Sequence, residues 1–268
     1  MSVERIIQAM GAQPLPADSN VASGVWWLVA SEDRNIVVSE GANATLAIFD
    51  AEGAVDVNID IMAGAELRLL HLVTSHSAAQ IAIAVAEGGV CRATEIVVAP
   101  SDTRVVASLV GRDARFELGG AFILTDEDNA SVTVDVNHMV ADCTSRTSYK
   151  GVASGKAHGS FSGLVYVAPN AQHTDSEQLS RNITIGDARI ETLPQLEIYA
   201  DDVKCSHGAT VGQMDSDAVL YMRQRGLDLA TAKRLQIEGF VDDVILHSSV
   251  ESCVELVTEV VAEKLNRL

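Results

Sequence analysis

The chain has 268 residues, nearly half of them apolar, so it can bury a sizeable core without disulphide or metal cross-links. Its 37 acidic and 19 basic residues give a formal net charge of −18, which opposes nucleic-acid binding because that binding depends on Lys and Arg side chains that neutralise phosphates. The opening residues lack the apolar segment and cleavage site of a signal peptide, and no later run approaches the roughly 20 apolar residues of a membrane span, so a cytoplasmic protein without a membrane partner is expected.

A short helix is predicted near the start of the chain. Ile6 and Met10 are four residues apart and fall on one face of such a helix. Gly11 and the Pro-Leu-Pro sequence at 14–16 then interrupt the helical pattern. We therefore expect residues 1–34 to form an N-terminal helix and a linker.

Short β-rich runs follow, separated by Gly, Asp and Asn, and no helical period interrupts them. A fixed period of about 23 residues is typical of a solenoid, whose coils bury their apolar faces only by stacking on one another. A β-sandwich also repeats strands with glycine turns, but the even spacing favours a solenoid, and residues 35–212 are predicted to form this all-β core. The glycine-led segments recur at steps of 23, 24 and 23 residues and are Gly41-Ala42-Asn43-Ala44, Gly64-Ala65-Glu66-Leu67, Gly88-Gly89-Val90-Cys91 and Gly111-Arg112-Asp113-Ala114.

The composition becomes helical again in the last part of the chain. Asp215 or Ser216 can cap a first helix, and Asp228 can cap a second that is expected to end at Gly239. A third helix, from about residue 249, carries an apolar stripe that must pack on something. Residues 213–268 are therefore predicted to form a C-terminal helical subdomain. The stripe consists of Val250, Val254, Val257, Val261 and Leu265.

The segment between the two regions reads Asp-Asp-Val-Lys-Cys-Ser-His-Gly-Ala-Thr-Val-Gly at 201–212. Together with Leu-Pro-Gln-Leu-Glu-Ile at 193–198 and Leu-Tyr-Met-Arg-Gln-Arg-Gly at 220–226, it resembles the C-terminal signature of the SufB/SufD family of the SUF system, which assembles iron–sulphur clusters. Further motifs follow the family's order upstream. They are Asn137-His138, Ser148-Tyr149-Lys150-Gly151-Val152, Phe161-Ser162-Gly163 and Ala171-Gln172-His173-Thr174-Asp175.

Within that family the chain resembles SufD more than SufB. It carries the SufD-type Cys-Ser-His, and it has Ser180 at the position where SufB-type chains carry a cluster-associated cysteine. The chain also looks like a short form that lacks most of the N-terminal helical extension, which leaves pairing with a second copy of itself open.

The resemblance implies a right-handed parallel β-helix flanked by helices, and a scaffold subunit rather than an enzyme. It implies that the C-terminal helices dock a SufC-like ABC ATPase and that the core pairs with a SufB-like subunit or forms a homodimer. Iron or an iron–sulphur cluster would be held transiently and shared with the partner, at Cys205 and His207, and the chain itself would bind no nucleotide. The expected ATPase contacts are Tyr221, Met222, Arg225, Gly226 and Phe240.

Cys205 and His207 are also a candidate ligand pair on physical grounds. On an extended strand they are two residues apart and point to one face, where a thiolate and an imidazole can share iron or another soft metal. Two ligands do not complete a tetrahedral site, so a partner surface would have to supply the others. Spacing alone leaves open that Cys205 is a buried structural thiol and that His207 hydrogen-bonds locally; the resemblance favours ligation for His207, and less firmly for Cys205.

Other motifs give weaker support for a binding or catalytic site. The segment at 151–157 looks like a phosphate loop but has the wrong glycine spacing and no Ser or Thr for magnesium. His71 and His76 are five apart and cannot share a strand face, so solvent or turn positions are expected. Two alternatives to the SufD-like function stay open: a β-solenoid enzyme of the polysaccharide lyase or acyltransferase type, and a purely structural stabiliser without metal contact.

Overall fold

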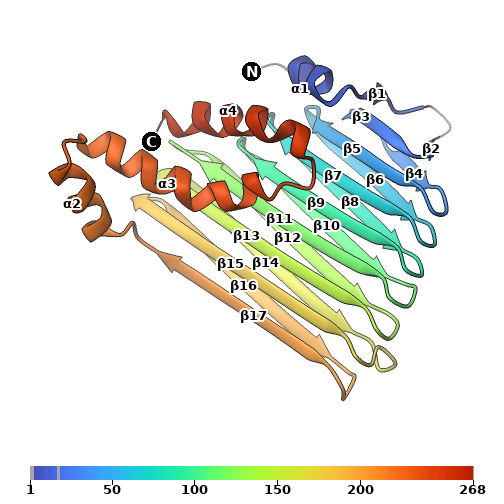
Figure 1. The fold of residues 1–268 in the computed structure, drawn as a ribbon. Helices are drawn as coiled ribbons and strands as arrows, with labels where there is room; N and C mark the ends of the chain where they lie inside the picture. Colours follow the sequence, from blue (N-terminus) through green and yellow to red (C-terminus); the bar gives the residue numbers. More distant parts are fainter. Residues whose placement is uncertain (1–2, 17–18, 268) are drawn as a thin grey trace.

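The computed structural model describes residues 3–16 and 19–267, and strands make up most of it (Figure 1). Each strand is short and is followed by a turn, as the β-rich runs predict. The strands are β1 (Gln13–Pro14), β2 (Asn20–Val21), β3 (Gly24–Ala30), β4 (Arg34–Val38), β5 (Asn43–Asp50), β6 (Gly53–Ile61), β7 (Glu66–Val73), β8 (Ser77–Val85), β9 (Val90–Val97), β10 (Ser101–Leu109), β11 (Arg115–Leu124), β12 (Asn129–His138), β13 (Thr144–Gly155), β14 (His158–Val167), β15 (Asp175–Gly186), β16 (Arg189–Ile198) and β17 (Lys204–Gly212).

The strands form two sheets. The odd-numbered strands make a nine-stranded sheet in the order β1-β3-β5-β7-β9-β11-β13-β15-β17, and the even-numbered strands make an eight-stranded sheet from β16 to β2. Every pairing among the described strands is parallel. The chain therefore alternates between two facing sheets, with two strands per coil. The predicted parallel β-helix is confirmed, and the region from β4 to β17 contains no helix.

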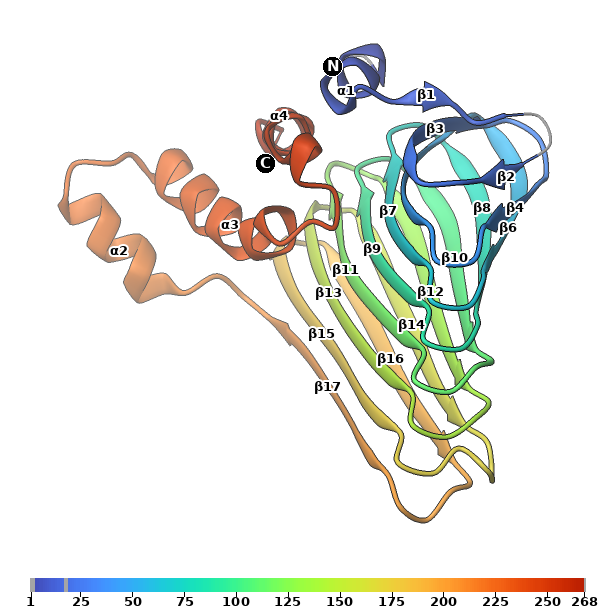
Figure 2. The same ribbon diagram turned by 45° about the vertical axis from the view of Figure 1, so that its right-hand side comes forward.

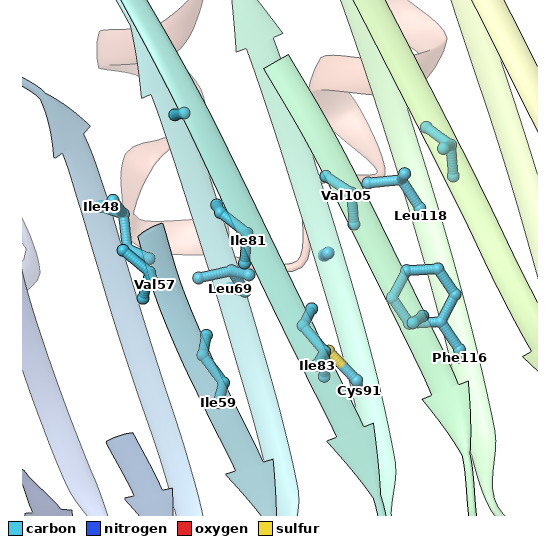
Figure 3. Close-up of a cluster of buried hydrophobic side chains, with 14 of the residues drawn as sticks. Ile48, Val57, Ile59, Leu69, Ile81, Ile83, Cys91, Val105, Phe116 and Leu118 are labelled. Carbon is cyan, nitrogen blue, oxygen red and sulfur yellow. The ribbon is translucent and has the colours of Figure 1, made fainter. Parts of the chain in front are cut away.

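The interior of the solenoid is filled by every second residue of both sheets. In β6 and β12, for example, buried and exposed or half-buried positions alternate along the strand. Figure 3 shows aliphatic side chains of β5 to β11 meeting between the sheets, with Cys91 and Phe116 among them. Stacking neighbouring coils thus builds one continuous apolar core.

Coil length is even only in the N-terminal half. Asn43 pairs with Glu66, 23 positions on, and Glu66 pairs with Val90, 24 positions on. Farther along, Thr144 pairs with Asp175, 31 positions on. The period of about 23 residues given by the glycines therefore does not extend to the later, longer coils.

The fourth glycine-led segment, which begins at Gly111, is out of register with the first three. Gly41, Gly64 and Gly88 have φ between 62° and 66°, and the residue that next adopts this left-handed turn is Asp113, with φ 59°. Gly111 serves close packing instead, because a Cβ there would lie 1.9 Å from the backbone nitrogen of Glu87 in the preceding coil.

Four α-helices and one 3₁₀ turn complete the described chain, namely α1 (Val3–Met10), α2 (Ser216–Gln224), α3 (Leu229–Leu246), η1 (Glu251–Cys253) and α4 (Val254–Leu265). The predicted caps are confirmed: the Asp215 and Asp228 side chains accept backbone N–H groups at the starts of α2 and α3. The prediction that the second helix ends at Gly239 is wrong. Burial of Val241 and Ile245 beyond it outweighs the cost of about 1 kcal/mol for a glycine within a helix.

Helices α1, α3 and α4 cover the outer face of the nine-stranded sheet (Figure 1). The strands beneath them, such as β7 and β11, end in runs of consecutive buried residues, because both of their faces are covered there. The predicted apolar stripe of the last helix packs into this layer. This apolar layer between helices and sheet includes the sheet residues Phe49, Leu72, Ile96, Ile123 and Val152 and the helix residues Ile6, Val241, Val257 and Val261. None of the described helices is long and apolar enough to cross a membrane.

Candidate functional site

Cys205 and His207 lie on β17, the last strand of the nine-stranded sheet. β17 pairs with β15, and the register sets Cys205 beside Ser176 and His207 beside Gln178. Ser176 and Gln178 are buried inside the solenoid. Their neighbours on β17 therefore share the interior-facing side of the strand, and the two candidate ligands fall on one face, as their spacing indicates.

The solenoid is open at this end. In the described chain no strand pairs with the outer edge of β16 or of β17. Leu193 is 58% exposed and Tyr199 is 60% exposed. β16 carries Pro194, which has no N–H to offer, whereas β17 contains no proline. The β17 edge is consequently a free template for pairing with another strand.

Cys205 is half-buried among small apolar residues, whereas Cys91, Cys143 and Cys253 are buried; none of the four is in a disulphide. Cys205 packs against a small apolar cluster made of Val165, Val167, Ala168, Ala171 and Ala200. Burial raises the pKa of the Cys205 thiol, and a backbone hydrogen bond from Ser176 only partly opposes that rise. Binding a metal would displace the proton, because only the thiolate ligates.

His207 is exposed, and its ring makes no hydrogen bond or ion pair with the described residues. Both ring nitrogens are thus available. The pair provides one sulphur and one nitrogen donor, which suits iron. No group of three or more His, Cys, Asp or Glu within 3–16 and 19–267 is arranged to hold a metal ion.

Polar side chains occupy the interior beneath the open end. The Nε2 atom of His138 lies 2.8 Å from the Ser145 hydroxyl, which lies 2.7 Å from the hydroxyl of Ser176. Ser180, at the position of the SufB-type cysteine, accepts hydrogen bonds from Asn182 and Thr192. The apolar filling of the earlier coils thus gives way to hydroxyls and amides near Cys205 and His207.

Four of the five predicted docking residues lie at the end of α2, which projects from the solenoid (Figure 2). Tyr221 is 57% exposed, and the Arg225 guanidinium lies 4.9 Å from the centre of its ring. Met222 is half-buried, and Gly226 ends the helix with φ +98°, a backbone conformation that favours glycine.

Phe240 is placed differently from the other four. Its ring is packed against the layer between helices and sheet. The buried Lys150 of β13 lies 5.1 Å from the ring centre and donates to the Phe240 carbonyl and to the Asp243 carboxylate, at 2.7 and 2.8 Å. Phe240 therefore fastens α3 to the sheet.

The structure also contains a buried charge network that the sequence interpretation missed. The prediction for His71 is wrong, because His71 is 2% exposed on β7, while His76 does lie exposed in a turn. The His71 ring nitrogens lie 2.9 Å from an Asp50 oxygen and 2.8 Å from a Glu95 oxygen. Tyr149 donates to the other Glu95 oxygen at 2.8 Å.

Burial alone would lower the pKa of His71, but the charges of Asp50 and Glu95 and their hydrogen bonds raise it to about 10. Burial alone would raise the pKa of Asp50, but His71 holds it below its usual value. The imidazolium therefore neutralises one of two buried carboxylates. Asp50 is 21 positions before His71 and Glu95 is 24 positions after it, so the three residues lie on consecutive coils. This spacing of about one coil is the sequence signal from which the network could have been predicted.

The chain is thus a two-sheet parallel β-helix with a thiol and an imidazole on its last strand and with helices along one outer face. The family model described as "SUF system FeS cluster assembly, SufBD core domain" matches residues 20–240, most of the chain. The chain belongs to this family, and its similarity to SufD is confirmed by the relatives.

The iron–sulphur cluster assembly protein SufD of Escherichia coli is 42% identical over 110 residues, covering 41% of this chain and 26% of the relative. A SufBD family protein of Synechocystis is 44% identical over 98 residues, covering 36% of this chain and 22% of the relative. A SufBD family protein of Mycobacterium tuberculosis is 31% identical over 164 residues, covering 58% and 41%. The matched stretches thus span less than half the length of each of these relatives.

Proposed function

We propose that this chain is a scaffold subunit of an iron–sulphur cluster assembly complex, and that it has no catalytic turnover of its own. The observation that carries the proposal is the position of Cys205 and His207 on the interior-facing side of β17, the edge strand at the open end of the solenoid. Iron or a nascent cluster is the cargo at that place. Membership in a family of SUF cluster-assembly proteins supports the same conclusion.

The cargo site would be completed by a second subunit. Two soft donors leave about half of a tetrahedral coordination sphere unfilled, and the partner would supply the remaining ligands. The free edge of β17, a strand that carries the exposed Val211, suits addition of a partner strand by β-augmentation. That partner is a SufB-like subunit or a second copy of this chain.

A SufC-like ABC ATPase would dock on the projecting helices. Leu220 and Tyr221 of α2 are more than half exposed, and Leu229 and Leu235 of α3 are 45% and 41% exposed. An apolar surface of this kind is typical of a protein interface when it is rimmed by charge, and Arg225 supplies that charge here. ATP would be bound by the ATPase and not by this chain, whose segment 151–157 lies on β13 and the turn after it, without the helix N-terminus of a phosphate loop.

The test is iron retention after His207→Ala. The chain is co-expressed with a SufB-like subunit and a SufC-like ATPase, purified without oxygen, and analysed for iron and acid-labile sulphide. We expect the complex to stay assembled and to lose most of its iron, since the substitution removes a ligand without emptying a core. His76→Ala, in an exposed turn, is the matched control. Equal iron in the His207→Ala and wild-type complexes would leave a purely structural stabiliser as the better account.

A further inference from the structure

Gln178 of β15 is a buried amide without a partner. The residue is 0% exposed, and within the described part of the chain neither Oε1 nor Nε2 has a hydrogen-bond partner. Burying an amide without hydrogen bonds costs on the order of 1–3 kcal/mol in proteins, so such groups are rare and call for an explanation.

The fold makes room for this amide. Gly163 faces it from β14, and a Cβ at that position would lie 1.9 Å from the Gln178 Nε2. Gly163 belongs to the Phe-Ser-Gly motif. Asn182, four positions along β15, differs because its amide nitrogen donates to the Ser180 hydroxyl and to the Thr210 carbonyl, at 3.0 and 3.1 Å. Among the described residues of β15, Gln178 thus lacks a hydrogen bond at both ends of its amide, whereas Asn182 lacks one only at Oδ1.

Gln178 of β15 is the neighbour of His207 on β17. The two residues are register partners, and strands in a sheet are about 4.8 Å apart, so they lie on the interior-facing side of neighbouring coils. On the facing sheet, the residue of the last coil beside Gly163 is Pro194, which has no N–H. The imidazole of His207, which makes no hydrogen bond with the described residues, is the polar side chain that β17 carries at the register position beside the amide.

We propose that Gln178 is a positioning residue for His207, which rests on the proposed function of His207 as an iron ligand. The Gln178 amide oxygen accepts the N–H of one ring nitrogen, and the other nitrogen keeps its lone pair for iron. Histidines that bind metals generally donate their second N–H in this way, which fixes the tautomer and the ring orientation.

The experiment uses the full chain in its assembled complex, with Gln178→Met, Gln178→Glu and the structural control Ser180→Ala. Met keeps the length of the side chain but removes the acceptor, whereas Glu retains an oxygen at the same place. Ser180 is equally buried and polar, but its column neighbour on β17 is Ala209. Iron(II) affinity is measured anaerobically, thermal unfolding is recorded, and ¹⁵N-histidine spectra report the tautomer of the His207 ring.

Gln178→Met is expected to weaken iron binding about 10-fold and to alter the His207 ring ¹⁵N shifts, with an unchanged or raised melting temperature. Gln178→Glu should restore most of the affinity, and it also provides the measurement if the Met variant does not fold. Wild-type affinity and ring shifts in Gln178→Met, or an equal loss in Ser180→Ala, would overturn the inference. If His207→Ala lowers iron while Gln178→Met does not, this inference alone fails; if His207→Ala leaves iron unchanged, the proposed function fails first.

Discussion

Replacing His71 with leucine tests the buried charge network inside the solenoid. The imidazole bridges Asp50 and Glu95 at hydrogen-bond distance, and all three side chains are inaccessible. Leucine fills a similar volume but leaves two buried carboxylates without a counter-charge. Removing one partner of a buried ion pair costs about 3–5 kcal/mol, which is a large part of the roughly 5–15 kcal/mol that stabilises a typical protein.

The pH dependence of the wild-type chain provides the sharper measurement. The folded pKa of His71 is about 10 and the unfolded value is 6.5, so the folded state binds the proton more tightly. The stabilisation is present in full below pH 6.5 and is lost as pH rises through 10. It amounts to at most roughly 5 kcal/mol, with a slope of up to about 1.4 kcal/mol per pH unit.

Urea unfolding between pH 7 and 10 measures this slope. The wild-type chain should lose stability across the range, and His71→Leu, already weaker at pH 7, should lose little more between pH 8 and 10. His76→Ala, in the exposed turn, should keep the wild-type slope. Parallel curves for the wild type and His71→Leu would refute the assignment of the slope to this imidazolium.

Three further outcomes are expected. Lys150→Met should loosen α3 and cost about 1–3 kcal/mol, because the buried ammonium donates to Asp243 and to a helix carbonyl; faster amide exchange in α3 is the measurement, and unchanged exchange contradicts the account. Tyr221→Ser should reduce co-purification of the ATPase while changing the unfolding free energy by no more than about 0.5 kcal/mol, since the side chain is exposed; full retention of the ATPase would remove Tyr221 from the interface. Gly163→Ala should destabilise the chain by about 1–3 kcal/mol through overpacking against Gln178, and a double-mutant cycle with Gln178→Ala should recover most of that loss; additive effects would argue against their contact.

Much of the architecture follows from the sequence because its signals are local or periodic. The Asp215 and Asp228 caps depend on residues two or three positions away, and the two-residue period of a strand puts Cys205 and His207 on one face. The glycine period indicates stacked coils, since each early coil repeats the same turn. These features need no knowledge of what the segments pack against.

The remaining features are non-local. Gly239 does not end its helix, because burial on the sheet decides the outcome there. His71 obtains its partners from the coils on either side of it, and the space for the Gln178 amide comes from Gly163 on the opposite sheet. Because the later coils are longer than the early ones, a fixed period does not align their residues, and the sequence alone does not show which positions are neighbours in the sheet.

The lengthening of the coils also determines how two molecules can meet. Gly24 pairs with Ala44, 20 positions on, whereas Asp175 pairs with Lys204, 29 positions on, so the body tapers from a broad end to a narrow one (Figure 2). A broad end placed on the narrow end of the next molecule would leave much of its rim unmatched, and head-to-tail growth into a fibre is disfavoured. Two broad ends match each other in outline, so we expect association through them to stop at a closed pair with two-fold or pseudo-two-fold symmetry.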